Sequence, residues 1–221
     1  MLFFVLKTIC GIAIIEKKKR GVALIKKIVI TGGPCGGKTS ALKSLSEAFS
    51  EMGYIVIIIP ETATELINAG ISTKSLGSAL QFQKCVTALQ MKKEESFLRE
   101  AEELGNEKVL ILLDRGLADS CAYLSDGEFE ELLSFFKKSR DEFISSYDAV
   151  FHMTTAADGA EKFYTTANNP ARTEEPPEAR DLDKKIIDAW SGHKNFYIID
   201  NSTDFKGKIA RLVEKASELL E

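Results

Sequence analysis

Short apolar runs alternate with longer amphipathic stretches along most of the chain. The apolar runs are rich in Val, Ile and Phe and nearly continuous, as in strands that are buried on both faces. They lie at 24–30, 54–59, 109–113, 149–153 and 196–199. Because helical stretches separate the runs, the pattern predicts a three-layer α/β fold in which a central five-stranded parallel sheet is covered by helices on both faces.

The amphipathic stretches carry apolar residues at spacings of three and four, which is typical of helices that pack by one face. In the first of them, Leu42, Leu45 and Phe49 follow this spacing, and Gly53 provides a stop signal. The helices predicted in this way cover 38–52, 62–69, 75–104 and 128–147.

The segment 154–177 departs from this alternation, because it is polar and holds three of the five prolines of the chain. A long polar excursion between two predicted core strands is usually a functional loop. We predict a lid at about 154–180, and the alternative is a surface insertion without a role in function.

The first 22 residues form an arm that is apolar and then basic. Its apolar part, 1–15, is shorter than the ~20 residues that a membrane-spanning helix needs, and the basic cluster 17–20 follows it, unlike the order in a secretory signal. Two interpretations remain: a strand-like extension or leader, and weak contact with a membrane surface. We expect residues 23–221 to form one domain that includes the lid.

Charge and cysteine content exclude several classes of protein. Residues 1–27 carry seven Lys or Arg and a single Glu, so the rest of the chain has a net charge of −10. Such a negative charge on the rest of the chain argues against nucleic acid as a partner, because nucleic-acid binding requires a basic surface. Four widely spaced cysteines without a C-x-x-C pair suggest neither a zinc site nor a disulfide framework, and a cytoplasmic location is expected.

A phosphate-binding motif follows the first predicted strand. Gly32-Gly33-Pro34-Cys35-Gly36-Gly37-Lys38-Thr39 matches G-x-x-x-x-G-K-[ST] in full, which is the pattern of a P-loop, so we expect residues 23–221 to form one P-loop domain. Glycines let successive backbone N–H groups point at phosphate oxygens, Lys38 contacts the β- and γ-phosphates, and the Thr39 hydroxyl ligates Mg²⁺. Ser40 extends the site into the helix start, which favours an anion. We predict that residues 32–40 bind ATP or GTP with Mg²⁺, and that Cys35 is simply a small residue that fits.

Charged residues also follow the second and third predicted strands. Asp114 ends a buried strand and is placed to hold Mg²⁺, and Arg115 is placed to clamp a substrate or the transferring phosphate. Glu61 follows Pro60 at the end of the second strand, where it can accept a proton from an acceptor hydroxyl. Its alternative role is that of an acidic residue at a helix start.

Together these motifs resemble a known family. Residues 31–39, Pro60-Glu61-Thr62-Ala63, Asp114-Arg115-Gly116 and 199–205 resemble a family of AAA-type ATP-binding proteins. This family includes the nucleotide-binding half of the TRPL translocation defect protein, and it is similar to nicotinamide riboside kinases and other nucleoside kinases. The resemblance implies nucleotide binding, a kinase-like fold and a lid whose arginines, here Arg172 and Arg180, close over the phosphates.

Further residues are candidates for recognition. The turn after the last strand, with Asn201, Ser202 and Thr203, is expected to hold the nucleotide base, and it is also a good helix cap. On the long helix, the resemblance to the kinases makes Gln81, Phe82 and Gln83 candidates for contact with an acceptor base. The alternative is that the Phe, at helical spacing, is part of the core. We expect structural roles for His152 and His193 because neither has a visible metal partner in the sequence.

These observations predict phosphoryl transfer from a nucleotide to a small nucleoside- or nucleotide-like acceptor whose identity the sequence does not give. The phosphates and the metal would be held by Lys38, Thr39 and Asp114. Glu61 would accept the proton of the acceptor hydroxyl, and Arg115 with Arg172 or Arg180 would stabilise the negative charge that develops on the transferring group. The alternative is a non-catalytic or slowly hydrolysing nucleotide-binding regulator that contacts a membrane through its basic arm.

Overall fold

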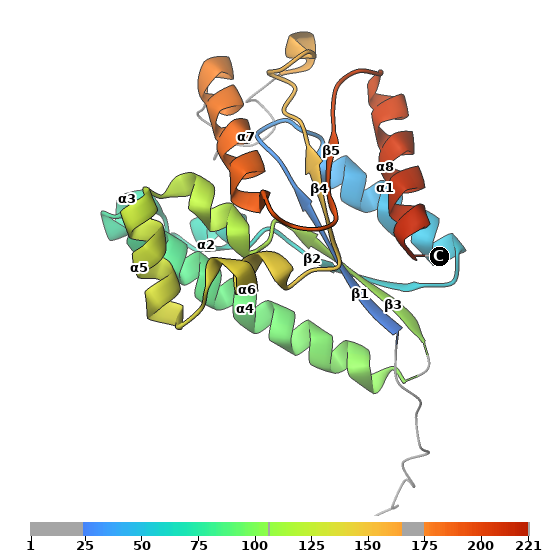
Figure 1. Cartoon of the computed structure of the whole chain (residues 1–221), viewed down its shortest axis with the longest axis horizontal. Helices are drawn as coiled ribbons and strands as arrows, with labels where there is room; N and C mark the ends of the chain where they lie inside the picture. Colours follow the sequence, from blue (N-terminus) through green and yellow to red (C-terminus); the bar gives the residue numbers. More distant parts are fainter. Residues whose placement is uncertain (1–23, 106, 165–174, 221) are drawn as a thin grey trace, which may run out of the picture.

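A five-stranded parallel sheet lies at the centre of the computed structural model, which describes residues 24–105, 107–164 and 175–220 (Figure 1). The strand order is β2-β3-β1-β4-β5. The strands are β1 (Leu24–Thr31), β2 (Ile55–Ile59), β3 (Lys108–Asp114), β4 (Ala149–Met153) and β5 (Phe196–Ile199). The predicted fold class and the five predicted strands are confirmed.

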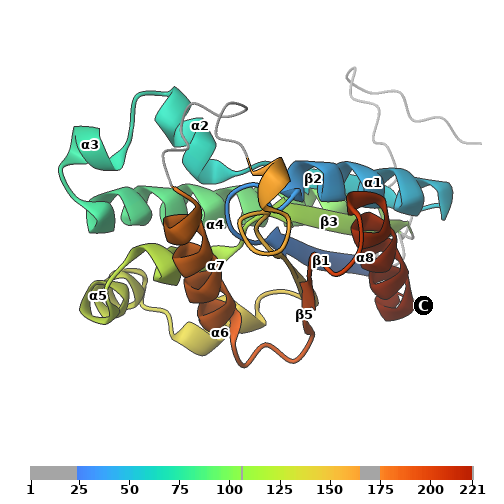
Figure 2. The ribbon, with the colours of Figure 1, turned by 90° about the horizontal axis from the view of Figure 1, so that it is seen from above.

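Helices cover both faces of the sheet, as the view from above shows (Figure 2). On one face lie α1 (Lys38–Glu51) and α8 (Phe205–Leu220). The other face is covered mainly by α4 (Ala79–Glu103), the 3-10 helix η1 (Leu117–Tyr123), α5 (Asp126–Phe136), α6 (Arg140–Ser145) and α7 (Pro176–Trp190). Two shorter helices, α2 (Thr62–Asn68) and α3 (Thr73–Leu76), pack on α4, and the 3-10 helix η2 (Glu161–Phe163) lies between β4 and α7 in the chain.

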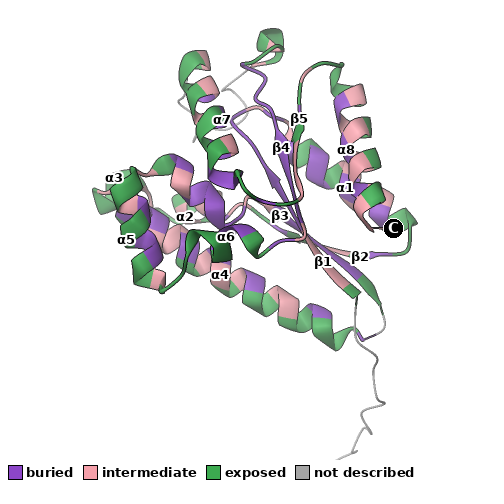
Figure 3. Cartoon of the chain, in the orientation of Figure 1, coloured by how far each residue is buried: buried purple, intermediate pink, exposed green. Residues whose placement is uncertain are grey.

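Successive side chains of the central strands point to opposite faces of the sheet, so each strand contributes to two separate parts of the core. In β1, Ile28 and Ile30 pack with α1 and α8, whereas Val29 packs with the opposite helices. All three side chains are fully buried, and Figure 3 shows buried positions along the central strands. Burial of an aliphatic side chain of this size contributes about 1.5–3 kcal/mol, so both faces support the strand that leads into the phosphate-binding motif.

The prediction of one helix over 128–147 is wrong. The chain forms α5 and α6 instead, because Lys137 adopts a left-handed conformation with φ 53°. Ser139 then starts α6, since its hydroxyl accepts a hydrogen bond from the Glu142 backbone N–H, and its own backbone N–H donates to the Glu142 carboxylate.

The long helix predicted over 75–104 is also interrupted. Gly77 has φ 68°, which ends α3, and Ser78 caps the start of α4 with a hydrogen bond from the Gln81 N–H. The short helix η1 was not predicted, and it proves important for the site below.

Two predicted features lie outside the described residues: the N-terminal arm and Arg172. The limits of the lid at 154–180 stay a prediction, although its first residues, 154–157, are buried. None of the helices in the described ranges is both long and apolar enough to cross a bilayer.

Candidate functional site

The carboxyl ends of the parallel strands meet at one edge of the sheet and form one cavity there. The phosphate-binding motif follows β1, Glu61 follows β2, and Asp114 ends β3. Residues 34–39, Glu61, Asp114 and Arg115 all line a cavity of about 840 Å³, which is within the size range of small-molecule sites. The structure therefore brings together the residues that the sequence predicted for phosphates, metal and acceptor.

The motif forms a loop that leads directly into α1. Gly37 precedes the helix with φ 90°, a left-handed conformation that favours glycine, and the Ala41 N–H donates to its carbonyl oxygen over 2.9 Å. Lys38 is only 8% exposed, and its ammonium donates to the carbonyl oxygens of Gly32 and Gly33, each over 3.0 Å. The ammonium thus lies over the loop, where it can contact a phosphate. Ser40 is exposed in the first turn of α1.

Thr39 and Asp114 supply oxygen atoms that suit Mg²⁺. Asp114 Oδ1 is buried and has no hydrogen-bond partner within the described ranges, and Thr39 lines the same cavity. Burial raises the pKa of Asp114, against the lowering effect of Lys38. The described residues hold no cluster of three or more His, Cys, Asp or Glu, but Mg²⁺ needs only one or two carboxylates beside phosphates and water. These two residues therefore fit the ion.

Glu61 and Arg115 form an ion pair in the cavity. The Arg115 Nε donates to Glu61 Oε1 over 2.7 Å, and its Nη1 donates to Asp119 Oδ1 over 3.3 Å. The backbone of Arg115 has φ 72°, a conformation that costs a non-glycine residue of the order of 1–2 kcal/mol. Its N–H donates to Ile30 O over 3.0 Å, so the neighbouring strand helps to hold this strained residue.

Sequence reasoning missed Asp119, which lies in η1 and is 3% exposed. Its carboxylate accepts hydrogen bonds from the Thr31 hydroxyl, the Gly116 N–H, the Trp190 indole and Arg115. Four donors compensate a buried charge that would otherwise be costly. Asp119 thus links the end of β1, helix α7 and the arginine of the site.

The environment of Glu61 keeps this residue ionised. Burial alone would raise the pKa of Glu61, but the charges of Arg115 and Lys38, and hydrogen bonds from Thr64 and Arg115, lower it to about 2. Glu61 is therefore a carboxylate at physiological pH and accepts hydrogen bonds in that form.

The lowered pKa of Glu61 makes the folded state sensitive to acid. Because the pKa is 4.5 in the unfolded chain and about 2 in the folded one, the stabilisation is complete above pH 4.5 and is lost as the pH falls toward 2. We expect the free energy of unfolding to fall between pH 7 and pH 3 by about 2 kcal/mol more in the wild type than in Glu61→Gln. Urea unfolding at both pH values measures this, and parallel pH profiles of the two proteins would contradict it.

A stripe of buried polar residues on α4 lies below the site. Gln83, Thr87, Gln90 and Glu94 recur at spacings of four, three and four, and each is at most 7% exposed. This spacing was visible in the sequence, but polar residues on an amphipathic helix usually face solvent. Gln83, Thr87 and Gln90 line the cavity, so this face of α4 forms a wall of the site rather than part of the apolar core.

Hydrogen bonds connect this stripe to the rest of the site. Thr62 donates to Gln90 over 2.5 Å, and Gln90 donates to Glu94 over 2.9 Å. Glu94 also accepts from Lys27 and from the Tyr147 hydroxyl. Burial and the Glu94 carboxylate raise the pKa of Tyr147 well above its usual value, so the hydroxyl stays protonated as a donor. The network holds α2, which begins beside Glu61, onto α4.

Two of the three acceptor candidates on α4 lie at the cavity. Phe82 and Gln83 line it and are buried, whereas Gln81 is exposed. Tyr123 and Phe163 add aromatic surface to the same wall. The cavity thus combines the phosphate-binding loop with apolar and amide surface.

The turn at 200–203 lies apart from the cavity wall. The Asn201 amide donates to Thr155 O and Asp158 O, and its oxygen accepts from Lys208. The side chain of Asn201 is thus committed to the protein, whereas Ser202 and Thr203 are exposed. Binding of a base by this turn stays a prediction that depends on the backbone and on these two residues.

The remaining candidates contact the backbone or other side chains. Arg180 on α7 donates to Ala157 O over 2.9 Å. His193 accepts from the Asn195 N–H through Nδ1, so its Nε2 is the donor to Tyr147 O at 3.0 Å, which is a structural role. His152 is fully buried, with Nε2 3.1 Å from Asp183 Oδ2.

A family comparison agrees with this geometry. A family model described as an AAA domain matches residues 27–208, which is most of the chain. The chain belongs to this AAA-domain family. The AAA domain is thus a nucleotide-binding P-loop domain, as the motif predicted. Comparison with curated proteins gives no match. The narrower likeness to the TRPL translocation defect protein and to nicotinamide riboside kinases stays a prediction.

Proposed function

We propose that this AAA domain is a cytoplasmic, Mg²⁺-dependent phosphotransferase that uses ATP or GTP. The acceptor is a small nucleoside- or nucleotide-like molecule. One observation carries the proposal: the P-loop residues Lys38 and Thr39 and the Glu61–Arg115 ion pair line the same cavity. A site for nucleotide binding alone needs no such pair of charged side chains beside the phosphates.

On this proposal the P-loop side of the cavity holds the nucleotide. Backbone N–H groups of residues 35–39 and the Lys38 ammonium bind the phosphates, and Thr39 and Asp114 hold Mg²⁺. The ion would neutralise charge that develops on the phosphate oxygens. Arg115, and Arg180 with Arg172 from the lid, would contribute positive charge around the transferring group.

Glu61 orients the acceptor hydroxyl. With a pKa of about 2, Glu61 is a weak base, so it accepts a hydrogen bond from the hydroxyl first. It takes the proton late, when bonding to phosphorus has made that proton acidic, which fits the loose transition state of phosphoryl transfer.

The charges of the cavity favour a hydroxyl acceptor over a phosphate acceptor. Among the described lining residues, Lys38 and Arg115 are the cations, and Arg115 is already paired with Glu61 and Asp119. A phosphate group at the acceptor end would have to displace these carboxylates. An uncharged sugar-like hydroxyl can bind without breaking the pairs.

Turnover with and without an acceptor tests the proposal. We expect nucleotide consumption with Mg²⁺ to rise by at least tenfold when a suitable nucleoside is added, and nucleoside monophosphates to be poorer acceptors. A thermal-shift screen of nucleosides in the presence of a non-hydrolysable ATP analogue would select candidates. Slow hydrolysis that no acceptor accelerates would instead support a nucleotide-binding regulator.

A further inference from the structure

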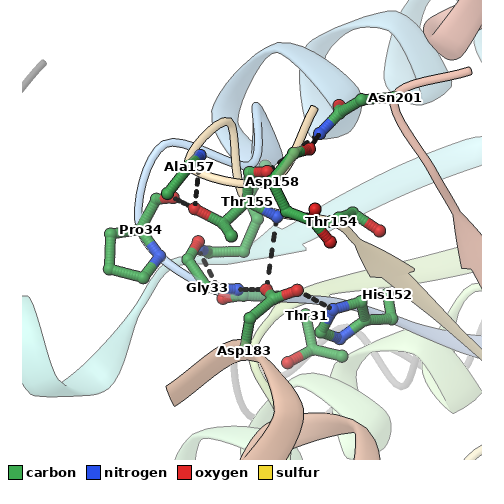
Figure 4. A network of polar contacts seen from close by, with 12 residues as sticks. Thr31, Gly33, Pro34, His152, Thr154, Thr155, Ala157, Asp158, Asp183 and Asn201 are labelled. Atoms are coloured by element: carbon green, nitrogen blue, oxygen red, sulfur yellow. Dashed lines mark hydrogen bonds and ion pairs between the residues drawn. The ribbon is translucent and has the colours of Figure 1, made fainter. Parts of the chain in front are cut away.

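The first half of the P-loop is anchored by a buried carboxylate on α7. Asp183 Oδ1 accepts a hydrogen bond from the Gly33 N–H over 2.7 Å and a longer one, 3.3 Å, from the Thr155 N–H (Figure 4). Asp183 Oδ2 lies 3.1 Å from His152 Nε2. Asp183 is 4% exposed and does not line the described cavity wall, so the proposed mechanism gives it no role.

A second contact joins the P-loop to the segment after β4. The Thr155 hydroxyl donates to Pro34 O over 2.5 Å, and it accepts a hydrogen bond from the Ala157 N–H. Gly33 and Pro34 are therefore held by neighbouring groups, one on α7 and one on the segment 154–158, which Figure 4 shows together.

The segment 154–158 is itself held by several elements. Asn201 donates to Thr155 O and Asp158 O, and Lys208 on α8 donates to Thr154 O over 2.7 Å. Arg180, one turn before Asp183 on α7, donates to Ala157 O. The P-loop, α7 and the region that begins α8 thus meet at one short segment of backbone.

The approach of Asp183 to the P-loop leaves no room for a side chain at position 33. A Cβ on Gly33 would lie 2.6 Å from Asp183 Oδ1, closer than such atoms approach. The motif consensus leaves this position open, and the glycine found here gives Asp183 room to approach the loop.

We propose that Asp183 is a positioning residue that holds the P-loop in its phosphate-binding conformation before the nucleotide arrives. It acts through the Gly33 N–H, and it makes the docking of α7 a condition for a formed phosphate site. A loop that is already shaped loses less conformational freedom on binding, so the anchor raises affinity without touching the ligand. The inference rests on nucleotide binding by the P-loop and not on phosphoryl transfer.

Binding of inorganic tripolyphosphate, which contacts only the phosphate site, tests the proposal. We expect Asp183→Ala to weaken tripolyphosphate by at least about tenfold in calorimetry, at a temperature where the variant is fully folded. Asp183→Asn keeps a carbonyl oxygen for the Gly33 N–H and should stay within about threefold of wild type or bind more tightly. Asp181→Asn, which removes an exposed carboxylate from the same helix, is the matched control.

Hydrogen exchange locates the effect. In Asp183→Ala without ligand, a peptide spanning 29–37 should exchange faster, while peptides from β3 and α4 should not change. Wild-type tripolyphosphate affinity in Asp183→Ala would overturn the proposal, whatever the loss of thermal stability. An equal loss in Asp183→Asn would also overturn it, because the charge and not the position would then matter.

A second variant covers the case in which Asp183→Ala fails to fold. Thr155→Val removes the hydroxyl that donates to Pro34 O and keeps the shape of the side chain. We expect it to weaken tripolyphosphate by about threefold to tenfold and to speed exchange in the same 29–37 peptide. Unchanged affinity and exchange in Thr155→Val would count against anchoring from this side of the loop. Tripolyphosphate binding and hydrogen exchange are both measured without an acceptor. These tests of Asp183 therefore remain valid even if the wild type transfers no phosphate.

Discussion

Lys38→Ala should abolish nearly all stabilisation of the protein by nucleotide. At a concentration 100 times the wild-type dissociation constant, ATP adds about 2.7 kcal/mol to the free energy of unfolding. For a domain of this size that corresponds to a Tm increase of about 5–10 °C. Loss of the charge-assisted contacts of Lys38 with phosphate, together worth about 3 kcal/mol, should weaken binding more than ~100-fold and leave a shift of about 1 °C.

Differential scanning fluorimetry with and without Mg²⁺ and ATP measures this shift. Lys43→Ala removes an exposed lysine from the same helix and is the matched control, expected to shift like the wild type. The nucleotide shift of Lys38→Ala is taken relative to the unliganded Tm of the same variant, because the buried Lys38 also donates hydrogen bonds to the loop carbonyls of Gly32 and Gly33. A wild-type nucleotide shift in Lys38→Ala would remove the P-loop from nucleotide binding.

Glu61→Gln should slow phosphoryl transfer by at least about a hundredfold while nucleotide affinity changes little. Glutamine cannot take the acceptor proton, and its carbonyl oxygen accepts from the Arg115 Nε without the negative charge that pairs with Arg115 in the wild type. Both effects concern the transition state and not the bound nucleotide. The decrease should therefore appear in kcat, with the nucleotide dissociation constant within about threefold of wild type.

Glu65→Gln is the control for Glu61→Gln, because Glu65 lines the same cavity but pairs with Lys93 on the exposed side of α2. It should transfer phosphate at nearly the wild-type rate. Equal kcat values for Glu61→Gln and the wild type would exclude Glu61 from the mechanism and favour a regulator that only binds nucleotide.

The parts of the site that could be predicted are those whose information is local. The P-loop is contiguous, and Glu61 and Asp114 follow strands whose parallel arrangement brings their ends to one edge. The helix boundaries at Gly77 and Lys137 were missed because apolar spacing continues across both positions, whereas backbone conformation interrupts the helices.

Other parts of the site depend on tertiary contacts that no local pattern reveals. Asp119 meets Thr31 from 88 positions away, and Asp183 meets Gly33 from 150 positions away. Each is an acidic residue on a short or amphipathic helix, where exposure is the usual expectation. The commitment of Asn201 to Thr155 and Lys208 was hidden for the same reason, since its sequence context also suits a helix cap.

The hydrogen bond between Gly33 and Asp183 also orders events during synthesis. The motif at 32–39 leaves the ribosome early. However, β4, which pairs with β1 beside the motif, ends at Met153, and Asp183, which anchors the motif, comes later still. Because Gly33 and Asp183 are 150 positions apart in the chain, we expect their hydrogen bond to form slowly and late in folding. A ribosome-bound nascent chain that ends before α7 should not bind ATP, although it carries every residue of the motif. A ribosome-bound chain that is extended beyond α8 should bind ATP.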